Sequence, residues 1–180
     1  MMTQHTRSLN SNIIFIIGAL GGLLFGFDTG VISGASSLIE SSLRLTITET
    51  SFVTSAVLIG SCIGALGVGG LADRFGRKPL LFMASIFFII GALMSAFAPD
   101  FGIMILARII LGLAVGSASA LTPAYLAELA PTERRGSLQT LFQLMITLGI
   151  LVAYFINIAF LGHNILGWSD WRWMLGTAVI

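Results

Sequence analysis

The stretch FVTSAVLIGSCIGALGVGGLADRFGRK, residues 52–78, decides the fold class. Its first part, residues 52–72, carries no charged side chain, and the charged segment DRFGRK, residues 73–78, follows it directly. A helix that crosses the roughly 30 Å hydrocarbon core of a bilayer needs about 20 apolar residues at about 1.5 Å of rise each. The stretch therefore predicts a membrane-spanning helix that ends at a charged membrane surface.

Four further apolar runs of similar length lie on either side of this stretch: residues 13–39, 79–98, 101–126 and 138–161. In a bilayer only helices and closed barrels satisfy every backbone polar group. None of the runs alternates polar and apolar residues as the strands of a barrel do. We therefore expect an all-α membrane protein with five complete spanning helices.

A sixth apolar segment opens at Trp171 and has reached only Ile180 when the chain stops. That length of helix is too short to cross the bilayer. We expect residues 1–12 to form an N-terminal tail and residues 13–180 to form an incomplete six-helix bundle. The chain is then the front part of a longer protein.

Composition excludes several other classes of protein. Hydrophobic residues make up 56% of the 180 residues and charged residues only 9%, against about 25% charged residues in soluble domains. A net charge of +1 gives no basic surface for nucleic acid. The single cysteine, Cys62, has no partner for a disulfide within the chain, and no Cys/His cluster has the spacing of metal ligands. Nothing resembles a nucleophile placed with a base, so we expect no metal, no cofactor and no enzymatic activity.

Positive charges set the expected orientation, because Lys and Arg near the ends of spans stay on the cytoplasmic side. Six cations fall on the side of the N-terminus: Arg7, Arg74, Arg77, Lys78, Arg134 and Arg135. Only Arg44 and Arg172 fall on the other side. We expect a multi-pass protein of the cell inner (plasma) membrane whose N-terminus is cytoplasmic.

Glycines recur at helical spacing in three of the runs. In residues 13–39 they stand at every fourth position from Gly18 to Gly34, and shorter repeats occur at Gly60 and Gly64 and in residues 112–116. Small residues let membrane helices approach closely. We interpret these stripes as packing surfaces between helices.

Asp28 and Arg108 are ionisable groups well inside spans, where each costs on the order of 2.5 to 3.5 kcal/mol. Counting the helical rise from the ends of their runs puts the two at similar depths, so they can pair if their helices face each other. One interpretation is a static structural ion pair. The other is a titrating site, in which Asp28 carries a proton and Arg108 modulates it.

Gln143 places an amide in an apolar span, six residues past Ser137. An amide offers two donors and one acceptor, which suit the hydroxyl groups of a sugar. A hydrogen bond between helices explains the residue equally well. Phe25 lies one turn before Asp28, and by itself an aromatic ring there is a weak indication of a ligand.

Several motifs resemble a known family. The segment GGLADRFGRK, residues 69–78, resembles the loop between the second and third helices of the major facilitator superfamily. The segment PAYLAE, residues 123–128, followed by RRG at 134–136 and by Gln143, resembles the sugar porter branch of that superfamily. The segment GGLLFGFDTGVISG, residues 21–34, is similar to the same branch.

The resemblance implies a twelve-helix transporter built from two six-helix halves that hold substrate between them near the midplane. It implies that Asp28 is the proton-linked acid of the first helix, that Arg108 is its partner, that Gln143 contacts sugar and that Phe25 lines the sugar pocket. Residues 143–150 look closest to bacterial galactose and arabinose proton symporters.

The resemblance also implies a cytoplasmic charge network that latches the two halves. Its members here are Asp73, Arg74, Arg77, Glu128 and Arg135. The expected partners are a monosaccharide, a proton, the lipid bilayer and the missing second half of the protein. Two other interpretations stay open: a facilitative carrier without proton coupling, and a membrane fragment that transports nothing.

Overall fold

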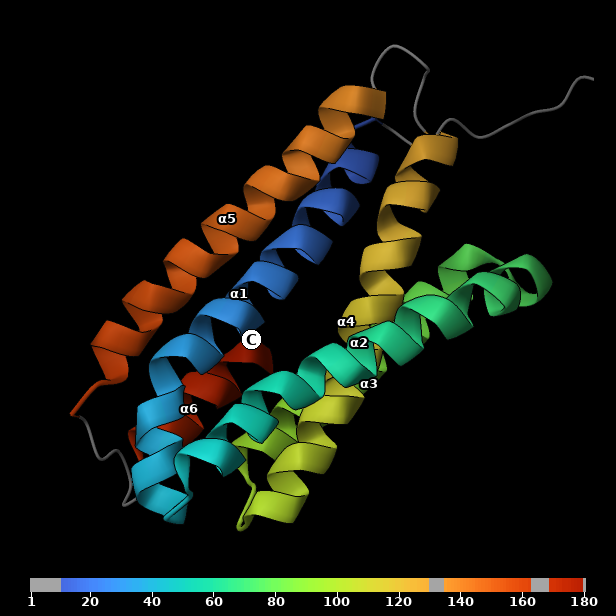
Figure 1. Cartoon of the computed structure of the whole chain (residues 1–180). Helices are drawn as coiled ribbons and strands as arrows, with labels where there is room; N and C mark the ends of the chain where they lie inside the picture. Colours follow the sequence, from blue (N-terminus) through green and yellow to red (C-terminus); the bar gives the residue numbers. More distant parts are fainter. Residues whose placement is uncertain (1–10, 130–134, 163–168, 180) are drawn as a thin grey trace, which may run out of the picture.

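The computed structural model describes residues 11–129, 135–162 and 169–179, and these are almost entirely helical (Figure 1). Residues 1–10 of the expected tail lie outside that description. Five helices, α1 to α5, are long and apolar enough to cross a membrane. The elements are α1 (Ser11–Leu43), α2 (Ile47–Phe75), α3 (Arg77–Ala96), α4 (Phe101–Leu129), α5 (Arg135–Phe160), α6 (Asp170–Gly176) and a 3₁₀ turn (Thr177–Val179).

The helices extend beyond most of the apolar runs that predicted them, and α2 shows why. It begins at Ile47 rather than at residue 52, because Thr46 and Glu49 form a capping box. The Thr46 hydroxyl accepts from the Glu49 backbone N–H at 3.3 Å, and the Thr46 backbone N–H donates to Glu49 Oε2 at 2.8 Å. Polar side chains thus satisfy the first turn of the helix, where a hydropathy pattern gives no signal.

The turn between α2 and α3 is a single glycine. Gly76 has a φ of 82°, a left-handed value that favours glycine, and its N–H donates to Ala72 O at 3.0 Å. Helix α3 then starts at Arg77, two residues earlier than predicted. Pro79 fits the first turn of α3, where its missing N–H removes no helical hydrogen bond.

Two helix pairs form the frame of the bundle. Helix α1 packs along α5, and α2 packs along α4, while α3 covers α4 and α6 packs against α3 and α1. Figure 1 shows α1 and α5 side by side, with α2 and α3 diverging from them toward the turn at residue 76. Trp171, Met174, Met104 and Leu111 are fully buried in the common core.

The glycine stripes lie where these helix pairs meet, which confirms the packing interpretation. A Cβ atom at Gly30 would lie 2.6 Å from Ala153 Cβ of α5. A Cβ atom at Gly60 of α2 would lie 3.0 Å from the Cα of Gly112 in α4. A side chain would clash at Gly30 and would push Gly112 aside at Gly60, so both helix pairs pack closely at their glycines.

The short α6 is tied to the end of α3. Arg172 donates from Nη1 to Ala96 O at 3.3 Å and from Nη2 to Ala98 O at 3.0 Å, and its guanidinium lies 4.6 Å from the Trp171 ring centroid. Carbonyl groups at a helix C-terminus lack intrahelical donors and attract cations. This contact gives Arg172 a structural reason to lie on the side opposite to most cations.

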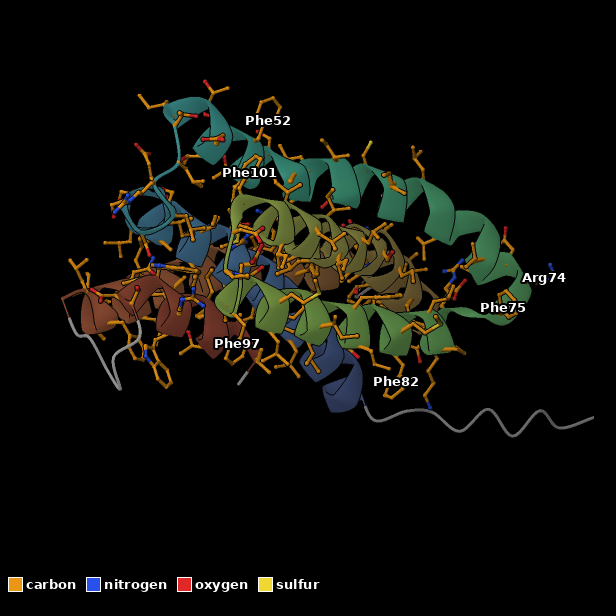
Figure 2. All side chains as sticks on the ribbon, turned by 90° about the horizontal axis from the view of Figure 1, so that it is seen from below. Phe52, Arg74, Phe75, Phe82, Phe97 and Phe101 are labelled. Carbon is orange, nitrogen blue, oxygen red and sulfur yellow. The ribbon has the colours of Figure 1, made fainter. Side chains whose placement is uncertain are left out.

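Large apolar side chains cover the outside of the bundle. Figure 2 shows Phe52, Phe82 and Phe97 pointing away from the helices, and each is more than half exposed. In water such a surface would drive association, whereas lipid tails solvate it. The exposed phenylalanines and the five spans together make the chain an integral membrane protein.

Candidate proton and substrate site

The structure brings Asp28 of α1 and Arg108 of α4 together inside the bundle. Arg108 Nη1 donates to Asp28 Oδ1 at 3.2 Å. The side chain of Arg108 has no exposed surface and that of Asp28 is 7% exposed. The two charges therefore meet in a region shielded from solvent, where electrostatic interactions are strong.

This ion pair leaves Arg108 incompletely bonded. Its Nε and Nη2 atoms are buried and have no hydrogen-bond partner among the residues that the structure describes. Each buried donor without a partner costs about 1 to 3 kcal/mol. Only one carboxylate oxygen is contacted, whereas the strongest Arg–carboxylate pairs are bidentate, with two parallel hydrogen bonds. Opening this pair therefore breaks one hydrogen bond rather than two.

The two expected sugar contacts have different surroundings. Gln143 is exposed on α5, and its side chain makes no hydrogen bond within the described part of the chain. The alternative of a bond between helices is therefore not realised there. Phe25 is half-buried and lines a cavity of about 150 Å³ together with Thr122 of α4 and Phe142, the neighbour of Gln143.

Two of the residues expected in the charge network are in contact. Arg77 Nη1 at the start of α3 lies 2.7 Å from Glu128 Oε1 near the end of α4. The Arg74 guanidinium lies 5.6 Å from the centroid of the Phe75 ring, and both are labelled at the end of α2 in Figure 2. Among the described residues Asp73 forms no ion pair, and the side chain of Arg135 lies outside the description.

Asn157 of α5 is a buried polar residue to which the sequence assigned no role. It is 7% exposed, and its Nδ2 donates to Gly30 O at 3.1 Å and to Val31 O at 3.5 Å. The signal was an amide in an otherwise apolar span, the same signal that drew attention to Gln143. The sequence alone does not tell which amide faces a helix and which faces open space.

These helices and their buried charges define a class, that of polytopic membrane transport proteins. The family model described as "Sugar (and other) transporter" matches residues 14–180. The chain belongs to this family of transporters, which places it in the major facilitator superfamily rather than among enzymes.

Individual relatives agree with the family. The chain is 52% identical to the D-xylose transporter of Levilactobacillus brevis over 97% of its own length and 37% of that protein. It is 44% identical to the galactose-proton symporter of Escherichia coli K12 over 98% of its length and 38% of that protein. The chain thus spans less than half the length of the curated relatives it matches.

Solved structures show the same fold. The proton:xylose symporter XylE bound to 6-bromo-6-deoxy-D-glucose superposes with a TM-score of 0.86 at 32% identity, covering 95% of this chain and 43% of XylE. The inward-open form of XylE from E. coli gives a TM-score of 0.82 and covers 93% of this chain and 44% of the other. The match confirms the predicted major facilitator bundle.

Proposed function

We propose that this chain forms the N-terminal part of a monosaccharide symporter that couples sugar entry to proton entry. The observation that carries the proposal is the buried pair of Asp28 and Arg108. An acid in a membrane interior is costly and is retained where it binds or moves a cation or a proton. Relatives that are named as proton symporters support the same function.

In the proposed cycle a proton from the outside neutralises Asp28. The attraction to Arg108 then falls, and the α1–α4 contact loosens at the level of the ion pair. Sugar binds between Gln143 and Phe25 on this side and a second six-helix half beyond residue 180. Proton and sugar together favour the inward-facing arrangement because they bind the two states with different affinity.

The Arg77–Glu128 pair supplies the cytoplasmic latch in this proposal. It joins α3 to α4 at the membrane surface while the outside is open, and Asp73, Arg74 and Arg135 complete the network when the second half is docked. Exposed pairs of this kind contribute about 0 to 1 kcal/mol each. Such a latch is weak enough to open in every cycle. The orientation proposed is a cytoplasmic N-terminus in the cell inner membrane.

An external pH electrode tests the function. Cells that produce the intact protein are de-energised and given single monosaccharides in a weakly buffered medium. Symport predicts that a transported sugar raises the external pH as protons enter with it. Entry of labelled sugar without a change in pH would identify a facilitative carrier, and the absence of both for every sugar would identify a protein that transports no monosaccharide.

A further inference from the structure

The interface between α1 and α5 combines closely packed glycines with one buried polar side chain, that of Asn157. Gly26 and Gly30 of α1 lie against the α5 backbone at Ile146 and Ile150. These are dispersion contacts, which lack the directional preference of a hydrogen bond. Within the described parts of α1 and α5, the side-chain hydrogen bonds that cross this interface all come from Asn157.

Asn157 contacts α1 next to the acid but from the other side. Gly30 follows Asp28 by two residues, which is about 200° around the helix and about 3 Å along it. The amide therefore binds the backbone on the α5 face, while the Asp28 carboxylate points to Arg108 on the α4 face. Helix α1 is held between two directional contacts at nearly one depth.

Gly34 of α1 leaves the space that this amide occupies. A Cβ atom at Gly34 would lie 2.7 Å from Asn157 Cγ, so any larger residue there would displace the side chain. The amide is also incompletely satisfied, because its buried Oδ1 has no partner among the described residues. An apolar side chain of the same size would avoid that cost. What the amide adds over an apolar side chain is the Nδ2 group, which donates to carbonyls of α1.

We propose that Asn157 is a positioning residue for proton coupling, which fixes the register of α1 against α5 so that Asp28 stays within reach of Arg108. The Asp28–Arg108 distance of 3.2 Å is already at the long end for a hydrogen bond. A slip of α1 by one residue is about 1.5 Å, enough to break it. This inference rests on the proposed symport.

Other charges do not substitute for this pair. Among the described side chains on the helices packed against α1, Arg108 of α4 is the cation that contacts Asp28. The charged residues of α2 and α6 lie near the ends of those helices, and residues 136–160 of α5 contain none. A change in register therefore acts on the acid through Arg108.

The test compares two activities of the intact protein in vesicles. Accumulation against a gradient needs proton coupling, whereas exchange of labelled for unlabelled sugar needs only the sugar site and the rocking motion. We expect Asn157→Leu to lower the ratio of accumulation to exchange roughly threefold to tenfold, as the loss of a buried hydrogen bond would. Normalising both activities to protein in the membrane removes any effect of folding yield.

Matched controls come from the same bundle. Ser117 Oγ of α4 lies 3.4 Å from Gly64 O of α2, so Ser117→Ala removes the same kind of bond from an interface without α1. We expect its ratio to stay at the wild-type value. Gly34→Ala displaces the amide without changing Asn157, and Gly67→Ala adds a methyl group in open space. The first should lower the ratio and the second should not.

Two results separate the possible failures. A wild-type ratio in both Asn157→Leu and Gly34→Ala would overturn the positioning role and leave symport intact. If Asn157→Leu does not reach the membrane, Gly34→Ala decides the question alone. A wild-type protein that exchanges sugar but never accumulates it with a proton gradient would instead overturn the proposed function.

Discussion

Asp28 and Arg108 show how a membrane protein keeps two opposite charges in its interior through a single contact between them. One oxygen faces one nitrogen at 3.2 Å, and two further nitrogens of Arg108 are unpaired among the described residues. Removing one partner of a buried pair leaves the other charge without compensation, whereas removing both avoids that cost. The fold is therefore destabilised most when only one of the two charges is removed.

Substitutions of Asp28 and Arg108 should have non-additive effects on stability. Asp28→Leu and Arg108→Leu should each lower the free energy of unfolding by about 3 to 5 kcal/mol, because each leaves an uncompensated charge. The double variant should lose less than either single variant. Denaturant unfolding of the purified protein in detergent measures all three, and additive losses would show that the two charges do not interact.

The amide of Gln143 predicts an effect on sugar affinity. Its side chain is exposed and unbonded in the described structure, so a sugar hydroxyl has no internal bond to displace. Gln143→Leu should raise the dissociation constant of the transported sugar roughly twofold to tenfold. Equilibrium dialysis measures it, with Gln139→Leu, one turn nearer the N-terminal end of α5, as the control that should change little. Equal effects from both variants would remove Gln143 from the sugar site.

At the scale of the elements, glycine decides which helices touch. Gly26 of α1 lies on the backbone of Ile146, while Gly67 of α2 has open space beside it. The first position belongs to a helix interface and the second to the outer surface of the bundle. Two glycines in similar apolar sequence therefore have different structural roles.

Gly26→Ala should cost about 1 to 3 kcal/mol, because the added methyl group forces α1 and α5 apart. Gly67→Ala should be neutral or slightly stabilising, since alanine favours helix more than glycine does. The midpoint of thermal unfolding in detergent compares the two variants directly. A larger loss at Gly67 than at Gly26 would contradict the packing described for α1 and α5.

The elements also show what the sequence could and could not predict. Five apolar runs predicted five spans, because a bilayer admits few other structures. Their ends were less accurate, since the capping box at Thr46 and Glu49 and the turn at Gly76 use polar contacts and dihedral angles. The depths of Asp28 and Arg108 followed from helical rise, but the role of Asn157 needed the knowledge that α5, and not another helix, covers Gly30 and Gly34.

At the scale of the whole molecule, we expect a second half. The chain matches 37% of the D-xylose transporter. In the proposed site Gln143 and Phe25 supply one side, and a second six-helix half supplies the other. We expect the chain by itself to transport no sugar.

The size of the native product checks this expectation. An antibody against residues 1–11 should detect a membrane protein of about 50 kDa, because 97% of this 19.1 kDa chain aligns with 37% of its relative. A band near 19 kDa would mean that the cell makes the fragment itself. Sugar uptake by vesicles that contain only the 180-residue chain would contradict the need for a second half.

The central claim is that the charge of Asp28 couples proton entry to sugar entry, and one variant of the intact protein tests it most directly. Asp28→Asn keeps the size of the side chain and removes its charge, while Glu40→Gln does the same to an acid three turns further along α1. We predict that Asp28→Asn still exchanges sugar but neither accumulates it nor raises the external pH, and that Glu40→Gln does all three. Accumulation by Asp28→Asn with the pH dependence of the wild type would contradict the account.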